Sequence, residues 1–112
     1  MTTHEFEIKE GDTGPDLATV LLGSDRRPVD LTNALSVTLT MALAGHPRTK
    51  VIDAATAIFA ADATGAVRYV WQPGDTDTVG TYNIEWHVVW GDDFEMTFPS
   101  VGYDKVVICA SL

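Results

Sequence analysis

The chain has 112 residues, 46% of them hydrophobic and 21% charged, and its formal net charge at pH 7 is −9. A chain of this length and composition can form a hydrophobic core without disulfides or bound metals, so it is not disordered. The length indicates one domain over residues 1–112. The seven basic residues are scattered among sixteen acidic ones. Because phosphate backbones and anionic lipids are bound by clustered lysine and arginine, we expect no nucleic-acid partner and no membrane partner.

Turn signals recur about every ten residues, which is the rhythm of an all-β sandwich or barrel. The pattern predicts strands at 4–9, 17–22 and 35–43. In the third of these, apolar residues alternate with Ser36, Thr38 and Thr40, so the hydroxyl side chains should face solvent. The apolar face predicted for this strand consists of Leu35, Val37, Leu39, Met41 and Leu43.

The second half of the chain continues in the same way. Residues 50–59 contain alanines that permit a helix, but their β-branched and aromatic residues favour two short strands with a kink. Further strands are predicted at 66–71, 81–90, 94–98 and 104–112, with a hairpin turn between Trp90 and Phe94. The sequence therefore predicts an immunoglobulin-like antiparallel β-sandwich of about 7–9 strands and no helix.

The segment GTYNIEW, residues 80–86, resembles the tyrosine corner of immunoglobulin-like domains. Tyr82 would donate a hydrogen bond to the backbone of the preceding loop, and Gly80 would allow the tight approach. Ile84 stands where antibody domains place a cysteine, and Cys109 is the one cysteine of the chain, so no disulfide joins the sheets. The predicted core residues are Leu39, Trp71, Ile84, Trp86 and Val88.

Residues with catalytic or metal-binding chemistry are present but form no recognised motif. The histidines, His4, His46 and His87, lack zinc-site spacing, and no nucleophile or phosphate-binding motif occurs. Several aspartates lie in predicted loops, where they could bind Ca²⁺ but are also ordinary turn formers. These loop aspartates are Asp12, Asp75, Asp77, Asp92 and Asp93. We expect no enzyme activity, no catalytic or metal-binding residue and no cofactor.

Three tryptophans in so short a chain could form a platform for carbohydrate. Trp71, Trp86 and Trp90 fall on the apolar side of alternating strands, which favours core packing instead. A carbohydrate-binding module that adheres to host surfaces is the alternative from another functional class. It would need an exposed aromatic residue, and Trp90 and Tyr103 are the candidates.

Four segments occur in order along most of the chain: GDTGPDL, PVDLTNALSVTLTM, DATGAVRYVWQPGDTDTVGTYNIEW and TFPSVGYDKVVI. Together they resemble the immunoglobulin-like domain of tailed-phage structural proteins, similar to the N-terminal domain of baseplate upper proteins. The resemblance implies a non-enzymatic virion component, made in the host cytoplasm and bound to other virion proteins in many symmetric copies or as a homo-oligomer. It favours a binding and assembly role on the tail or baseplate. Capsid decoration and the head–tail neck are the alternatives.

The N-terminal segment HEFEIKEGDTGPD is the candidate contact arm, with Phe6 and Ile8 as its apolar residues. It is strand-like, terminal and followed by a turn, so it could add to the sheet of a neighbour. An ordinary first strand of the sandwich is the alternative interpretation.

Overall fold

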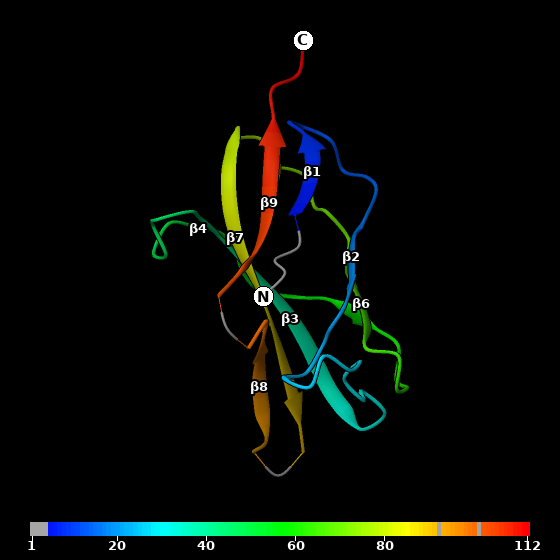
Figure 1. Cartoon of the computed structure of the whole chain (residues 1–112). Coiled ribbons are helices and arrows are strands. Elements are labelled where there is room, and N and C mark those ends of the chain that lie inside the picture. The colour runs from blue at the N-terminus through cyan, green and yellow to red at the C-terminus, as the bar shows by residue number, and fades with distance from the viewer. Residues whose placement is uncertain (1–4, 92, 101) are drawn as a thin grey trace.

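The computed structural model describes residues 5–91, 93–100 and 102–112, in which strands and turns alternate and no helix occurs. The prediction of an all-β, sandwich-like fold is confirmed (Figure 1). Each strand falls inside a segment predicted from the sequence or extends beyond it by one residue. The nine strands are β1 (Glu5–Lys9), β2 (Leu17–Val20), β3 (Ala34–Leu43), β4 (Lys50–Thr56), β5 (Ile58–Phe59), β6 (Ala66–Tyr69), β7 (Gly80–Trp90), β8 (Glu95–Phe98) and β9 (Asp104–Cys109).

The strands form two sheets of unequal size. The larger sheet has the order β1-β9-β7-β3-β4, and the smaller sheet has the order β2-β6-β5. Both β8 and β9 pair with β7, β9 along Gly80–Ile84 and β8 along Trp86–Val89. The long strand β7 is thus the centre of the larger sheet, with β3 along its other side.

One strand pair departs from the predicted antiparallel arrangement. Strand β1 runs parallel to β9, and Figure 1 shows the two side by side with their arrowheads at the same end. A short hairpin imposes antiparallel pairing only on strands that are neighbours in sequence. Because β1 and β9 come from opposite ends of the chain, no hairpin constrains them, and the larger sheet is mixed.

The kink predicted within residues 50–59 is confirmed, and it is the point where the chain passes from one sheet to the other. Strand β4 belongs to the larger sheet and β5 to the smaller one, with Ala57 between them. Ala57 is buried, and its N–H donates to the carbonyl oxygen of Val37 at 2.9 Å. A strand that changes sheets in this way forms a corner of the sandwich.

The core lies between the two sheets and follows the alternation of β7. The five predicted core residues, Leu39, Trp71, Ile84, Trp86 and Val88, are all buried. Leu39 and Trp86 are cross-strand neighbours on β3 and β7. The indole Nε1 of Trp86 has no hydrogen-bond partner among the described residues, so packing alone holds this ring.

Two predicted apolar faces are shorter than expected. Leu35 is 68% exposed because the pairing of β3 with β7 shifts register between Ala34 and Ser36, which turns Leu35 outward. On the hairpin after β7, Phe98 is buried, but Phe94 and Met96 are exposed. Strand β8 pairs only with β7 among the described strands, so alternation along it does not guarantee a covering sheet.

Candidate functional site

Hydrogen bonds join two loops that are far apart in the sequence, the turn after β1 and the loop before β7. The backbone N–H of Gly11 donates to the carbonyl oxygen of Thr76 at 3.0 Å. The hydroxyl of Thr76 donates in turn to the carbonyl oxygen of Asp12 at 2.7 Å, and Thr76 is the one buried polar residue among those described. These bonds join the turn after β1 to the loop before β7.

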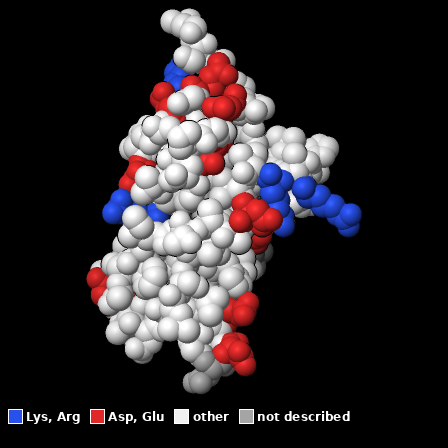
Figure 2. All heavy atoms as spheres, turned by 180° about the vertical axis from the view of Figure 1, so that it is seen from behind, with Lys and Arg blue, Asp and Glu red and all other residues white. Residues whose placement is uncertain are grey.

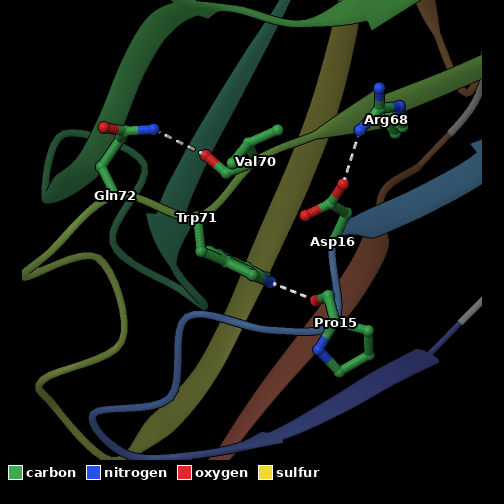
Figure 3. Close-up of polar contacts among 6 residues, drawn as sticks. All are labelled: Pro15, Asp16, Arg68, Val70, Trp71 and Gln72. Atoms are coloured by element: carbon green, nitrogen blue, oxygen red, sulfur yellow. Dashed lines mark hydrogen bonds and ion pairs between the residues drawn. The ribbon is translucent and has the colours of Figure 1, made fainter.

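Trp71 ties the same turn to the end of β6. Figure 3 shows its indole Nε1 donating to the carbonyl oxygen of Pro15, at 3.0 Å, while Arg68 and Asp16 form an ion pair at 2.7 Å beside it. The Trp71 ring is buried and packs edge-on against Tyr69, with 5.7 Å between ring centroids. Trp71 therefore serves as a wall of the core and a tie between loops, and it is not accessible as a carbohydrate platform.

Asp75, one of the loop aspartates considered for a metal site, is engaged by its own loop. Its Oδ2 accepts a hydrogen bond from the Tyr69 hydroxyl at 2.6 Å and another from the Gln72 backbone N–H at 2.8 Å. Burial, the hydrogen bond to Asp75 and the negative charge of Asp75 together raise the pKa of the Tyr69 phenol. Asp75 thus has a structural role in closing the loop between β6 and β7.

The hydrogen bond expected of a tyrosine corner is present. The buried Tyr82 donates its hydroxyl proton to the carbonyl oxygen of Thr78 at 2.8 Å. Burial raises the pKa of this phenol. The tight approach expected at Gly80 is not present, because a Cβ there would lie 3.5 Å from the Tyr82 ring, which is an ordinary contact.

Two further motifs of the resemblance, PVDLT and DATG, form a pair of matching turns. Asp30 accepts hydrogen bonds from the backbone and hydroxyl of Thr32, and Asp62 accepts the same pair from Thr64. In both cases these bonds lower the pKa of the carboxyl group, the hydroxyl bond contributing most. The backbone N–H of Leu31 donates to the carbonyl oxygen of Asp62 at 2.8 Å, which joins the two turns.

The remaining candidates for metal or acid–base chemistry do not come together. Within residues 5–91, 93–100 and 102–112, no group of three or more His, Cys, Asp or Glu side chains could hold a metal ion. His87 lies on the outer face of β7, between Thr97 Oγ1 at 3.1 Å and Glu95 Oε1 at 2.9 Å. His46 is exposed in the loop after β3, and the predicted residues His4 and Asp92 lie outside the described residues.

The candidate contact arm requires correction. Ile8 is buried in the core, and Phe6 is half-buried with its ring 6.1 Å from that of Trp71. Strand β1 is paired with β9 along its whole length, from Glu5–Lys105 to Lys9–Cys109. Phe6 and Ile8 are therefore inside the fold, because the apolar alternation that suggested an arm is satisfied by the protein's own core.

The outer face of the smaller sheet exposes a group of apolar side chains around Arg68, which the alternation in the sequence did not predict. Ala18, Arg68 and Ile58 form one cross-strand row, and Val20 faces Ala66 in the next. Val20 is 44% exposed and Ile58 47% exposed. These residues line a shallow apolar depression, which we call the β2–β5 face. The signal was present in LATV and AIF, whose apolar residues are too many for a strand buried on one side.

The outer face of the larger sheet is hollowed and polar. A hollow of about 570 Å³ lies over β3 and β7, between the β3–β4 hairpin and the loop before β9. Its floor consists of cross-strand pairs, Thr38 with His87, Thr40 with Glu85 and Ala42 with Asn83. Tyr103, one of the two aromatic candidates named above, lines it and is 43% exposed. The other, Trp90, is half-buried with its ring 5.2 Å from that of Phe94.

Comparison with known protein families, with curated proteins and with solved structures gives no match to this chain. No helix long and apolar enough to cross a membrane is found in the part of the chain that the structure describes.

Proposed function

We propose that this protein is a non-enzymatic structural component of a tailed-phage virion, acting as a binding and assembly module on the tail or baseplate. The phage assignment rests on the four segments that resemble this class in order along most of the chain. Among their polar residues, Asp75 and Asp62 bind backbone N–H groups of their own turns, and Thr76 binds the backbone of the turn after β1. The motifs therefore have a role in building the fold, as is expected of a structural module whose loops do not carry catalytic groups.

The assembly role rests on one observation, the exposed β2–β5 face. An apolar sheet face on a strongly acidic chain is a feature of interaction surfaces, because charge keeps the rest of the molecule apart from its neighbours. Figure 2 shows how charge is distributed over one whole side of the molecule: Lys, Arg, Asp and Glu gather at the upper end, along the margins and on a projecting tip, and other residues fill the wide area between them. The proposed occupant of the β2–β5 face is an apolar surface of a neighbouring virion protein.

The area of the β2–β5 face suits weak contacts made in many copies. The smaller sheet has three short strands, of which β5 has two residues. A contact of this size is below that of a standard stable interface, but a virion repeats each contact by symmetry. Weak single contacts then add up to firm attachment through multivalency.

The test is the copy number of the protein per particle, measured by quantitative mass spectrometry on virions with heads and tails separated. A small copy number that follows the symmetry of the tail, recovered with tails, is expected. Many copies recovered with heads would replace the tail assignment with capsid decoration or a neck position. Absence from purified particles would overturn the proposal.

A pair of matched variants tests the β2–β5 face itself. Val20→Glu places a charge on this face, whereas Val79→Glu places the same charge in the loop before β7, at a valine of similar exposure (44% against 48%). We expect Val20→Glu to reduce incorporation into particles at least about tenfold, since a carboxylate covered by an apolar surface loses its hydration. Val79→Glu should be incorporated normally. Equal incorporation of the two variants would contradict the role of this face.

A further inference from the structure

We propose that the hollow on the outer face of the larger sheet binds a short neutral oligosaccharide. The inference goes beyond the proposed assembly role and does not depend on it. The β2–β5 face would hold a protein neighbour, whereas the hollow lies on the other sheet.

The volume of the hollow fits a small ligand. About 570 Å³ falls within the roughly 300–1,000 Å³ that small-molecule sites occupy. The hollow is open on one side and flanked by the β3–β4 hairpin, which contributes Gly45, Pro47 and Lys50. An open hollow of this volume can take a short ligand that keeps one side in solvent.

The polar groups on the floor match sugar hydroxyls. The carboxylate of Glu85 is half-buried and makes no hydrogen bond or ion pair within the described residues. Asn83 accepts a hydrogen bond from Lys105 Nζ at 3.1 Å through its carbonyl oxygen, which orients its amide N–H₂ group and leaves that group as a donor. A carboxylate acceptor next to an amide donor pairs with neighbouring hydroxyls, each of which donates and accepts.

Tyr103 supplies the apolar part of such a site. Its exposed ring lines the hollow, and an aromatic face packs against the C–H face of a sugar ring while the hydroxyls bind elsewhere. Ala42 and Leu43 add apolar surface beside the polar floor. The lining thus offers an aromatic ring for the C–H groups of a saccharide and polar side chains for its hydroxyl groups.

The same residues exclude other ligand classes. An extended peptide binds to sheets through unpaired backbone edges, but β3 lies between β4 and β7, and β7 has partners on both sides. An anionic sugar or a phosphate would meet the unpaired Glu85 carboxylate, while the two lysines at the hollow already have partners, Lys50 in Asp53 and Lys105 in Asn83. Neutral sugars meet neither obstacle.

The experiment is a titration of the ¹⁵N-labelled protein with neutral trisaccharides built from glucose, galactose, mannose or N-acetylglucosamine, followed by amide chemical shifts. We expect at least one of them to shift amides of Thr38, Thr40, Asn83, Glu85 and Tyr103, and to leave the β2–β5 face unchanged. Sialyllactose, the anionic probe, should shift none of them. The proposal is overturned if no neutral trisaccharide perturbs the hollow at millimolar concentration, or if the anionic probe binds better.

Three variants separate recognition from folding. Tyr103→Ala should weaken binding about tenfold, the upper range for an aromatic contact, whereas Tyr103→Phe should keep it because the ring face remains. Phe94→Ala, at an aromatic residue 55% exposed and outside the hollow, should bind like the parent protein. The amide spectrum of each variant reports its folding directly. Binding that survives Tyr103→Ala unchanged would contradict the assigned site.

Discussion

Two buried tyrosines use their hydroxyl groups in different ways. Tyr82 donates to a backbone carbonyl of the loop before its own strand, and Tyr69 donates to the carboxylate of Asp75. Both rings are buried between the sheets. The hydroxyls therefore hold the loop between β6 and β7 from its two ends, which is a local effect that single substitutions can measure.

Replacing Tyr82 by phenylalanine removes one hydrogen bond and keeps the ring. We expect Tyr82→Phe to lower the free energy of unfolding by about 1 kcal/mol, the usual net value of such a bond. Urea denaturation monitored by tryptophan fluorescence checks this. Tyr103→Phe is the control and should have no effect, since the Tyr103 side chain is exposed. Equal stability of Tyr82→Phe and the parent protein would contradict a stabilising tyrosine corner.

The raised pKa values of Tyr69 and Tyr82 predict instability in alkali. Both phenols stay protonated in the folded state above the pH, about 10, at which an unfolded tyrosine ionises. Their contribution to stability is therefore complete below pH ~10 and is lost as the pH rises toward the folded-state pKa values. Above pH ~10 the free energy of unfolding should fall by up to about 1.4 kcal/mol per pH unit for each tyrosine.

Urea denaturation between about pH 9 and pH 11 measures this slope. Tyr69→Phe should reduce it, because one of the two perturbed phenols is gone. If the free energy of unfolding fell with pH equally steeply in Tyr69→Phe, groups other than Tyr69 would be responsible for the loss of stability in alkali.

At the scale of elements, the contact between the two Asp–Thr turns depends on a glycine. Gly65 has a φ of +69°, and a Cβ there would lie 2.7 Å from the carbonyl oxygen of Leu21 and 3.1 Å from the backbone nitrogen of Val29. Those atoms belong to backbone that is itself hydrogen-bonded, since Leu21 donates to Gly65 and Val29 donates to Leu21. A shift of either backbone segment would strain the hydrogen bonds that join Leu21 to Gly65 and Val29 to Leu21.

A pair of glycine variants separates this clash from backbone strain. Gly45 has a φ of +79° and no heavy atom within 4 Å of its would-be Cβ, so Gly45→Ala carries only the strain of the left-handed conformation, about 1 kcal/mol. Gly65→Ala carries that strain and the clash, and we expect it to cost at least about 2 kcal/mol more. Thermal denaturation of the two variants compares them. Similar melting temperatures would show that the chain relaxes around the new methyl group.

At the scale of the whole molecule, charge repulsion opposes the compact state. The net charge is −9, and the ion pairs Arg68–Asp16 and Lys50–Asp53 are both partly or largely exposed. Exposed ion pairs contribute little to stability, so little stability is lost when salt screens them. Salt also screens the repulsion among the excess acidic groups, and this gain should be larger than the loss.

We therefore expect sodium chloride to stabilise the protein modestly, raising the urea midpoint between low and physiological ionic strength. Sodium chloride titration at constant pH and temperature measures it. A midpoint that falls with salt would show that the ion pairs outweigh the general repulsion.

Much of the fold could be predicted from the sequence because alternation is a local property. The pattern of apolar residues located β3, β7 and a kink within residues 50–59, and it identified Leu39, Ile84, Trp86 and Val88 as inward-facing residues. The prediction that Leu35 faces the core was wrong, because a register shift between paired strands turns the residue to the other face. The alternation along one strand gives no sign of such a shift.

The functional surfaces were less predictable, because they depend on which elements lie beside one another. Tyr103 and Glu85 are far apart in sequence, and only the pairing of β9 with β7 brings them to one hollow. In the same way, the alternation around Phe6 and Ile8 is compatible with a contact arm, and only the pairing of β1 with β9 places these residues against the core.

The sequence by itself determined the all-β class, the position of the strands and the absence of a disulfide, since these follow from periodicity and composition. The tertiary structure alone decided the parallel pairing of the two ends of the chain, the exposure of the β2–β5 face and the hollow over β3 and β7. Pairing between distant segments determines which side chains become neighbours, and no local pattern in the sequence encodes that choice.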